Sequence, residues 1–357
     1  MKERLDALVA GLPAEVDAAL ITSEVSRRYL TGMPSSAGTL LVFKDAPACL
    51  LMDSRYIEKA RLIVKDCNVV LQRRLAAQLR EQLQSHGVKR LAVESDYMTL
   101  SDYLVFQKRL PGVELLMDGR LSGLLRQMRA IKSSEELRAI QQAQSITDAA
   151  YTHILNYIRP GRTEREIAGE LLDFCYRQGS ERPAFDFIVV SGANSSMPHG
   201  VPTDKAVEQG DFVTMDFGCV VDGYCSDMTR TVAVGEVDEE HRRVYASVLA
   251  AQYAALDAAR SGIPGKDVDI AARNVISDAG YGHCFGHSTG HSVGLEIHES
   301  PLFSPAEERI LQPGMVITVE PGIYLEGKFG VRIEDMIVIE PDGNRDLTHS
   351  AKEFTVV

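Results

Sequence analysis

The amino-acid sequence predicts an α/β (α+β) protein with two domains, and three observations lead to this prediction. The chain has 357 residues, whereas a single hydrophobic core stops growing near ~250–300 residues. Hydrophobic residues make up 45% of the chain and charged residues 25%, a balance typical of globular proteins that excludes a disordered, collagenous or coiled-coil chain. Short apolar runs also alternate with amphipathic helical patterns along the sequence.

Charge and hydropathy exclude several classes of partner. The 38 Lys and Arg residues against 50 Asp and Glu give a net charge of −12, which is the wrong sign for phosphate contacts. We therefore expect neither nucleic acid nor an anionic membrane as partner. No run reaches the ~18 apolar residues of a membrane span, and residues 1–20 lack the continuous apolar region of a signal peptide.

The cysteines point to a reducing compartment. Six are scattered along the chain without a CxxC pair, which is typical of reduced, buried thiols. We therefore expect a cytoplasmic protein. A disulfide between Cys219 and Cys225 across a turn remains an alternative.

Residues 1–127 are expected to form a smaller N-terminal α/β domain. Short buried strands are predicted at 18–21, 39–43, 48–52 and 91–93, and helices at 57–64 and 76–86. A capping box from Ser133 to Glu136 then opens a helical pattern that runs to about Ile158. We therefore place the domain boundary at residue 127 and expect the second domain to span 128–357.

The second domain repeats its own pattern. Pro160-Gly161 precedes a second capping box (Thr163 to Glu166) and a helix, and Pro264-Gly265 precedes another helix 104 residues later. The glycines six residues before Asp216 and Glu320 keep the same offset. Because two features share one offset, the sequence indicates an internal duplication, with two helix-covered halves of one curved sheet around a pseudo-twofold axis. Coincidence is the alternative, since Pro-Gly pairs are common.

Four carboxylates are predicted on core strands near this axis. Asp216 lies in an apolar run that precedes the hairpin signal Asp222-Gly223, and a two-residue loop there would place Asp227 diagonally across from Asp216 on one face. In the second half, Glu320 and Glu334 flank a turn at 326–330, with Glu334 in the strand pattern 331–339. Buried anions repel one another, so we expect them to bind cations, and two divalent ions would balance four negative charges. Each carboxylate taken alone could instead be solvated or salt-bridged.

Histidines supply the remaining candidates. His291, in the Gly-rich segment 286–294, is expected to be the fifth ligand, and His287 to lie beside the ligands or to be structural. His199 and His298 are in Met197-Pro198-His199-Gly200 and His298-Glu299-Ser300-Pro301, segments suited to the rim of a site. A histidine there can donate to a carbonyl or stabilise a tetrahedral intermediate, although an ordinary loop histidine is the alternative.

Five ordered motifs together resemble the pita-bread metallopeptidases of family M24, which include prolidase, aminopeptidase P and methionine aminopeptidase. The motifs are Met215-Asp216-Phe217-Gly218, residues 226–231, residues 286–294 with 298–301, residues 319–324, and residues 331–335. Residues 128–357 are similar to the catalytic domain. Residues 1–127, with Tyr29-Leu30-Thr31-Gly32 and Asp53-Ser54-Arg55-Tyr56, are similar to the N-terminal domain of the creatinase, prolidase and aminopeptidase P branch.

The resemblance implies a role for each candidate residue. It implies that two divalent metal ions are held by Asp216, Asp227, His291, Glu320 and Glu334, with Asp227 and Glu334 bridging. It implies catalytic roles for His199, His298, Glu320 as general base, and Arg332, which would orient the bridging Asp. It implies substrate contacts by His199, His287, His298 and Arg332. Such carboxylate-rich sites favour Mn²⁺, with Co²⁺, Zn²⁺ and Fe²⁺ as alternatives.

The implied activity is hydrolysis of the Xaa-Pro bond in small peptides, by a hydroxide shared between the two metals. An Xaa-Pro dipeptidase (prolidase) is expected, with Xaa-Pro aminopeptidase (aminopeptidase P) as the alternative and a metal-free binding module as a third. The five ligands argue against creatinase, and the N-terminal domain argues against methionine aminopeptidase. The resemblance also suggests a homodimer.

Overall fold

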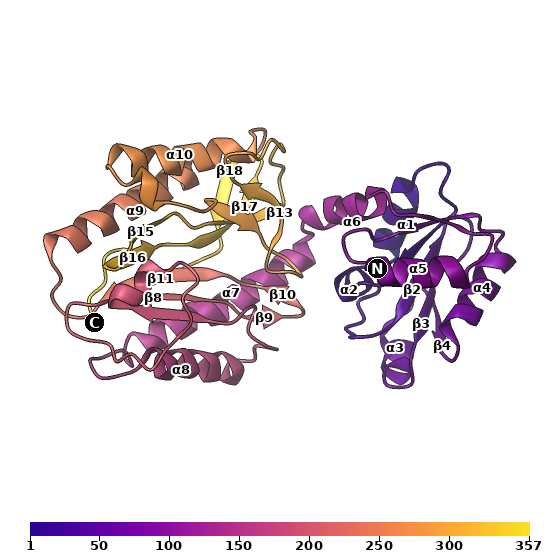
Figure 1. Ribbon diagram of the computed structural model, residues 1–357, viewed down its shortest axis with the longest axis horizontal. Coiled ribbons are helices and arrows are strands. Elements are labelled where there is room, and N and C mark those ends of the chain that lie inside the picture. The colour runs from indigo at the N-terminus through magenta and orange to yellow at the C-terminus, as the bar shows by residue number, and fades with distance from the viewer. The chain divides into compact units, whose positions relative to one another are not determined.

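The computed structural model describes residues 1–357 and divides the chain into two compact units, Met1–Arg129 and Ala130–Val357 (Figure 1). This division lies two residues from the domain boundary predicted at residue 127. No helix has both the length and the apolar character needed to span a membrane. All six cysteines are free, so the alternative disulfide between Cys219 and Cys225 is absent.

The first unit is built on one six-stranded mixed sheet. The strand order is β4-β3-β2-β1-β5-β6, in which β1 pairs antiparallel with β2 and parallel with β5. The central strands β1, β2 and β3 are buried along their whole length, as expected for continuous apolar runs covered on both faces. The strands are β1 (Ala18–Ile21), β2 (Thr39–Phe43), β3 (Cys49–Met52), β4 (Asn68–Leu71), β5 (Arg90–Val93) and β6 (Glu114–Leu116).

Six helices accompany this sheet. Leu79 and Leu83 are buried one turn apart in α4, which is the pattern of an amphipathic helix. The helices predicted at 57–64 and 76–86 are confirmed as α3 and α4. The six are α1 (Lys2–Gly11), α2 (Glu24–Thr31), α3 (Ile57–Ile63), α4 (Leu75–Ser85), α5 (Leu100–Arg109) and α6 (Arg120–Ala130).

The second unit contains two pairs of helices that lie on opposite sides of its strands (Figure 1). Both predicted capping boxes are present, Ser133 with Glu136 and Thr163 with Glu166. The first helix ends four residues earlier than predicted, at Ile154. The helices are α7 (Ser134–Ile154), α8 (Glu164–Arg177), α9 (Glu239–Ala258) and α10 (Gly265–Asp278), with short 3₁₀ turns η1 (Gly192–Ser196) and η2 (Gly282–Cys284).

The strands of this unit follow each helix pair in the same order. The two main sheets are β11-β8-β7 and β13-β12-β14-β17-β18. Two helices followed by antiparallel strands thus occur twice, as the duplication predicts. The strands are β7 (Ile188–Ser191), β8 (Phe212–Phe217), β9 (Val220–Val221), β10 (Tyr224–Cys225), β11 (Met228–Ala233), β12 (Gly290–Ser292), β13 (Glu299–Phe303), β14 (Val316–Val319), β15 (Gly322–Leu325), β16 (Phe329–Arg332), β17 (Asp335–Glu340) and β18 (Gly343–Asp346).

The predicted hairpin at Asp222-Gly223 has the expected register. Val221 pairs with Tyr224, and Asp222 and Gly223 both have positive φ, 49° and 84°, as a two-residue turn of this kind requires. The same register places Thr229 opposite Asp216. Asp227, two residues before Thr229, therefore lies diagonally across from Asp216 on the same face.

The strands form two main sheets and two two-stranded ones, β10-β9 and β15-β16, rather than the single curved sheet expected. We call the line along which the two halves of this unit meet the seam. The Glu334 N–H donates across it to the Thr229 carbonyl (3.1 Å), and the Thr231 hydroxyl bonds the backbone of Arg332. Because these contacts replace a continuous ladder, the predicted strand 331–339 is interrupted between β16 and β17. Glu334 consequently lies at the break, directly on the seam.

Each helix pair packs on its own apolar cluster, and full burial of a Val, Leu or Ile side chain contributes ~1.5–3 kcal/mol. The two clusters hold the strands, and hence the seam, between rigid layers. The first includes Ala143, Ile167, Leu171, Val213 and Met215, and the second Val248, Ala272, Ile317 and Ile337.

Candidate active site

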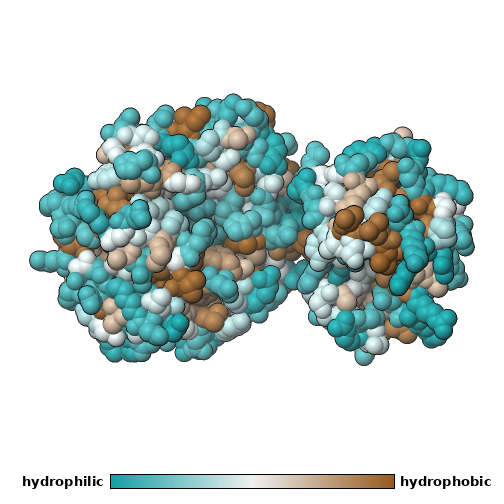
Figure 2. Space-filling model, in the orientation of Figure 1, coloured by the Kyte–Doolittle hydropathy of each residue, from teal (hydrophilic) through white to brown (hydrophobic).

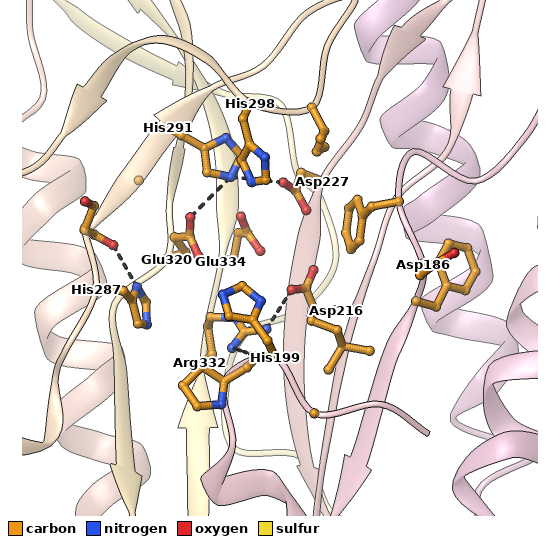
Figure 3. Close-up of a pocket in the computed structure, with 18 of the residues that line it drawn as sticks. Asp186, His199, Asp216, Asp227, His287, His291, His298, Glu320, Arg332 and Glu334 are labelled. Carbon is orange, nitrogen blue, oxygen red and sulfur yellow. Dashed lines mark hydrogen bonds and ion pairs between the residues drawn. The ribbon is translucent and has the colours of Figure 1, made fainter. Parts of the chain in front are cut away.

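Five acidic or imidazole side chains converge where the two halves of the second unit meet (Figure 3). They line a cavity of about 680 Å³. They are Asp216 in β8, Asp227 between β10 and β11, His291 in β12, Glu320 directly after β14, and Glu334 between β16 and β17. All five residues predicted as metal ligands are therefore in one place.

His291 faces two carboxylates with an unprotonated nitrogen. Its Nδ1 lies 3.2 Å from the Ser292 carbonyl and therefore carries the proton, while burial lowers the pKa of the ring to about 4. Its Nε2 lies 3.5 Å from Asp227 Oδ2 and 3.4 Å from Glu320 Oε1. A lone pair directed at carboxylate oxygens is repulsive unless a cation lies between them, so the donor set fits a metal.

The tightest group consists of Asp227, His291 and Glu334, in which one ligand atom from each lies within 4.8 Å of the others.

Asp216 adds a second indication of a cation. Its Oδ2 accepts from Arg332 Nη2 (2.6 Å), but its Oδ1 is buried without a hydrogen-bond partner. A buried carboxylate oxygen without a partner is costly, and a cation would satisfy it.

The electrostatics of the cluster agree with this fit. Burial, reinforced by the charge of Glu334, raises the pKa of Asp227 well above its ordinary value. Burial and the charge of Glu320 do the same for Glu334. Burial also raises the pKa of Glu320 to about 8. These buried carboxylates repel one another when all are ionised, and bound cations would relieve that repulsion.

Arg332 links several parts of the site. Its direct carboxylate partner is Asp216, and the role toward the bridging Asp227 that the resemblance implies stays a prediction. Its Nε donates to the Thr229 hydroxyl (3.0 Å), which in turn donates to Glu334 Oε2 (2.7 Å). The guanidinium therefore reaches one carboxylate directly and another through a threonine.

Tyr324 extends this network to His287. The Tyr324 hydroxyl accepts from Arg332 Nη1 (2.8 Å) and lies 2.9 Å from His287 Nε2. The other ring nitrogen of His287 lies 2.8 Å from the Ser288 carbonyl and carries the proton, so the tyrosine donates to Nε2. Burial lowers the pKa of His287 to about 4, which keeps this ring neutral.

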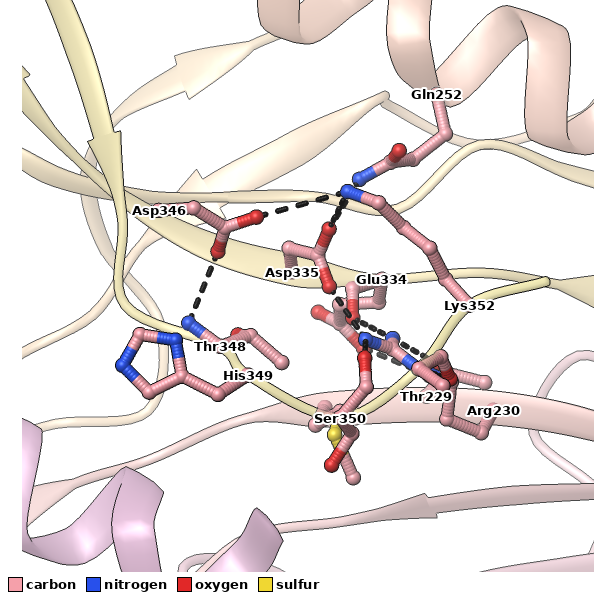
Figure 4. Close-up of polar contacts among 12 residues, drawn as sticks. Thr229, Arg230, Gln252, Glu334, Asp335, Asp346, Thr348, His349, Ser350 and Lys352 are labelled. Carbon is pink, nitrogen blue, oxygen red and sulfur yellow. Dashed lines mark hydrogen bonds and ion pairs between the residues drawn. The ribbon is translucent and has the colours of Figure 1, made fainter.

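A second buried network supports the backbone beside Glu334 (Figure 4). The Arg230 guanidinium donates to the Glu334 carbonyl and to Asp335 Oδ1 (2.6 Å), and Lys352 Nζ lies 2.5 Å from Asp335 Oδ2. Burial opposes the ionisation of Asp335, but Arg230 and Lys352 outweigh it and hold the pKa below its ordinary value. Because removing one partner of a buried ion pair costs ~3–5 kcal/mol, this network fixes the strand break that presents Glu334.

The other predicted histidines also line the cavity. Figure 3 shows His298 beside His291 and His199 across the carboxylates, near Arg332. The rings of His298 and His291 lie 4.5 Å apart, and both His199 and His298 are exposed to solvent. All predicted site residues are thus brought together.

Sequence reasoning missed Tyr324, Thr229 and Arg230 as parts of the site. All three lie inside the motifs that carry the family resemblance, but nothing in their spacing assigns them a contact. Their roles depend on side chains that reach across the seam between the halves, and a sequence does not show which side chains meet there.

Gly290 allows β12 to approach β14 closely. A Cβ at this position would lie 1.9 Å from the Thr318 carbonyl oxygen. The Thr318 hydroxyl accepts from the His291 N–H (3.0 Å) and donates to Glu320 Oε1 (3.2 Å). The close approach therefore sets the position of His291 relative to Glu320.

Comparison with known proteins agrees with this geometry. The model of metallopeptidase family M24 matches residues 138–341, and that of the creatinase/prolidase N-terminal domain matches residues 4–131. The chain belongs to metallopeptidase family M24, and it is therefore a metallopeptidase. The family recognised from the five motifs is confirmed, as is the pita-bread fold with its N-terminal domain.

Individual relatives cover nearly the whole chain. The uncharacterized peptidase YqhT of Bacillus subtilis (strain 168) is 43% identical over 343 residues, which are 96% of each chain. An Xaa-Pro dipeptidase structure from Bacillus anthracis has a TM-score of 0.96 at 39% identity and covers 99% of both chains. An X-Pro aminopeptidase structure from Thermotoga maritima MSB8 has a TM-score of 0.91 at 36% identity, covering 99% of this chain and all of the other.

The glycine at 290 provides a test of the site geometry. We expect Gly290→Ala to weaken Mn²⁺ binding by ~10-fold or more, because the added methyl group separates His291 from Glu320. Isothermal titration calorimetry on the metal-stripped protein measures this. Gly286→Ala is the matched control, since a Cβ there meets nothing within 4 Å. Equal affinity in Gly290→Ala and wild type would show that the close approach does not set the ligand geometry.

Metal uptake should release protons. Asp227, Glu320 and Glu334 all have raised pKa values, so a cation that binds below about pH 8 must displace protons from them. The apparent affinity for Mn²⁺ should therefore rise with pH, by up to ~10-fold per pH unit for each proton released. Calorimetric titrations in buffers of different ionisation enthalpy count these protons, and an affinity independent of pH would contradict the assignment.

Proposed function

We propose that this protein hydrolyses the peptide bond between an N-terminal residue and proline, with Xaa-Pro dipeptides as its substrates. The observation that carries the proposal is the convergence of His291 and four carboxylates on one cavity, with His199 and His298 at its edge (Figure 3). The relative of known structure from Bacillus anthracis, named an Xaa-Pro dipeptidase, supports the choice of substrate.

The proposed ligands of two divalent cations are Asp216, Asp227, His291, Glu320 and Glu334, with Asp227 and Glu334 bridging. One imidazole among four carboxylates suits Mn²⁺ best. When bound, such ions polarise the scissile carbonyl and lower the pKa of water.

The side chains of the site then have distinct tasks. Glu320 is the proposed general base, which takes a proton from the attacking water and passes it to the proline nitrogen as the C–N bond breaks. His298 donates to the carbonyl oxygen as negative charge develops on it, and His199 binds the carbonyl from the other side. Arg332 holds Asp216 in place, and the neutral ring of His287 contacts the substrate.

The size and lining of the cavity suit a small peptide with an apolar second residue. A volume of about 680 Å³ is in the range of small-molecule sites. Its apolar wall can cover a pyrrolidine ring. This wall consists of Phe185, Phe187, Ile188, Val201, Pro202, Ile297 and Leu302.

Xaa-Pro aminopeptidase activity on longer peptides is the second candidate, and one observation favours it. A dipeptidase must bind the free carboxylate of proline, but Arg332 is the one Arg or Lys among the lining residues. All three of its nitrogens already bond protein groups. The carboxylate would then fall to His199, His287 or groups outside this cavity. The relative from Thermotoga maritima, named an X-Pro aminopeptidase, agrees with this candidate.

The metal-free binding module has no such support, because the buried donor set fits a cation. Cytoplasmic location, homodimeric assembly and a substrate contact by Arg332 stay predictions.

The proposed function is tested by amino-acid release from Ala-Pro and Ala-Pro-Ala, using enzyme stripped by a chelator and reloaded with Mn²⁺. We expect metal-dependent cleavage of Ala-Pro. Cleavage of the tripeptide alone would establish the aminopeptidase instead. No release from either peptide by the reloaded enzyme would contradict the proposed specificity.

His298 should matter for the chemical step rather than for metal binding. We expect His298→Ala to retain its metal content and to lose kcat by ~10²-fold, since it removes a donor to the developing oxyanion. Steady-state kinetics and metal analysis of the same preparation separate the two effects. His283→Ala, at an exposed histidine of η2 that does not line the cavity, is the control. An unchanged kcat in His298→Ala would assign the residue a structural role.

A further inference from the structure

The residues that carry His199 form a surface segment whose two ends meet at one buried carboxylate. The segment runs from Ser191, at the end of β7, through η1 and His199 to Thr203. Glu164, the first residue of α8, lies beneath it with 0% of its surface exposed. No part of the proposed reaction uses Glu164.

Glu164 bonds both ends of the segment. Its Oε1 accepts from the Ser191 N–H (2.6 Å) and hydroxyl (3.0 Å). Its Oε2 accepts from the Thr203 N–H (2.9 Å) and hydroxyl (2.6 Å). The Asn194 side-chain amide reaches both oxygens, at 3.1 and 3.2 Å. An ionised carboxylate is a pure acceptor, so this set of donors suits it fully.

The middle of the segment is held from the other half of the unit. The Gly330 N–H donates to the Ser195 hydroxyl (2.9 Å), and Arg332 Nη1 donates to the carbonyl of Pro198 (3.2 Å), directly before His199. The segment is therefore tied to the metal-site side at its middle and to α8 at its two ends. Each end has one further bond, from the Arg165 N–H to the Thr203 carbonyl (3.1 Å) and from Lys205 Nζ to the Ser191 hydroxyl (3.0 Å), but Glu164 bonds both ends at once.

The contacts of Glu164 are not needed to cap its own helix. The capping box satisfies the N–H groups of Thr163 and Glu166, and the carbonyls of Lys205 and Thr203 accept from those of Glu164 and Arg165. Burying a carboxylate is costly unless hydrogen bonds offset it, and all the side-chain partners of Glu164 given above lie in 191–203. The Glu164 carboxylate therefore hydrogen-bonds the segment rather than the backbone of its own helix.

We propose that Glu164 is a positioning residue, which sets the place of His199 in the active site by joining the two ends of the segment that carries it. This inference rests on the proposed function, in which His199 binds the substrate carbonyl. A displacement of about 1 Å at such a group can cost ~10²-fold in rate.

The test is Glu164→Gln, with Glu166→Gln as the matched control on the same helix. The glutamine amide places an N–H group against donors at one end of the segment, whereas Glu166 supports the helix without touching the segment. We expect Glu164→Gln to keep its affinity for Mn²⁺ and to lose kcat by ~10- to 100-fold. Glu166→Gln should lose thermal stability alone.

A double-mutant cycle with His199→Ala separates positioning from a general structural effect. If Glu164 acts through His199, then Glu164→Gln should change kcat by less than ~2-fold in the His199→Ala background. An equal loss of kcat in both backgrounds would overturn the proposal. Thr203→Val removes one donor without altering α8, so it tests the same prediction should Glu164→Gln fail to fold.

Hydrogen exchange keeps this test independent of activity. Amides of residues 191–203 should exchange ~10-fold faster in Glu164→Gln than in wild type, and at the wild-type rate in Glu166→Gln. Unchanged exchange in Glu164→Gln would overturn the proposed anchoring. A wild-type enzyme inactive on Xaa-Pro peptides would instead overturn the proposed function, and the exchange rates would still decide whether Glu164 holds the segment.

Discussion

Mutual repulsion among Asp216, Asp227, Glu320 and Glu334 is the constraint on which the rest of the site depends. Two like charges ~4 Å apart repel by ~4 kcal/mol even at an effective dielectric constant of 20, so the group persists only if the surrounding layers are rigid. The helix pairs and their separate apolar clusters supply that rigidity. Hydrogen bonds from Thr229, Thr318 and Arg332 then fix individual oxygens. The proposed cations would complete the balance of charge that the protein alone leaves incomplete.

The two halves of the internal duplication contribute equal numbers of carboxylates to the site but different histidine, arginine and positioning residues. Each half contributes one pair of carboxylates from equivalent strands. His291, His298 and Arg332 come from the second half alone, whereas His199 and Glu164 come from the first. The two sides of the site that meet at the seam therefore carry different side chains. Contacts across it, such as Arg332 with the Pro198 carbonyl, join those sides.

Much of this arrangement could be predicted from the sequence because it depends on local signals. The capping boxes at Ser133 and Thr163 and the turn at Asp222-Gly223 depend on neighbouring residues, and the structure confirms them. The pairing of Asp216 with Glu320 was accessible because these two carboxylates recur at an offset of 104 residues in apolar strands. The break before β17 and the partner of Arg332 were not accessible. Both depend on hydrogen bonds between segments ~100 residues apart, for which no sequence period exists.

The order in which the chain is synthesised determines when the network around Asp335 can form. Translation delivers all five proposed ligands by Glu334, but the cation of Lys352 and the carbonyls of Ser350 and Ala351, which orient Arg230, follow later. A nascent chain that ends before them would bury the Asp335 carboxylate without its ion pair to Lys352. The polar network that supports the strand break beside Glu334 is therefore completed only after Lys352 has been synthesised. A chain truncated before Ser350 would therefore present Glu334 on a strand break that lacks part of its polar support.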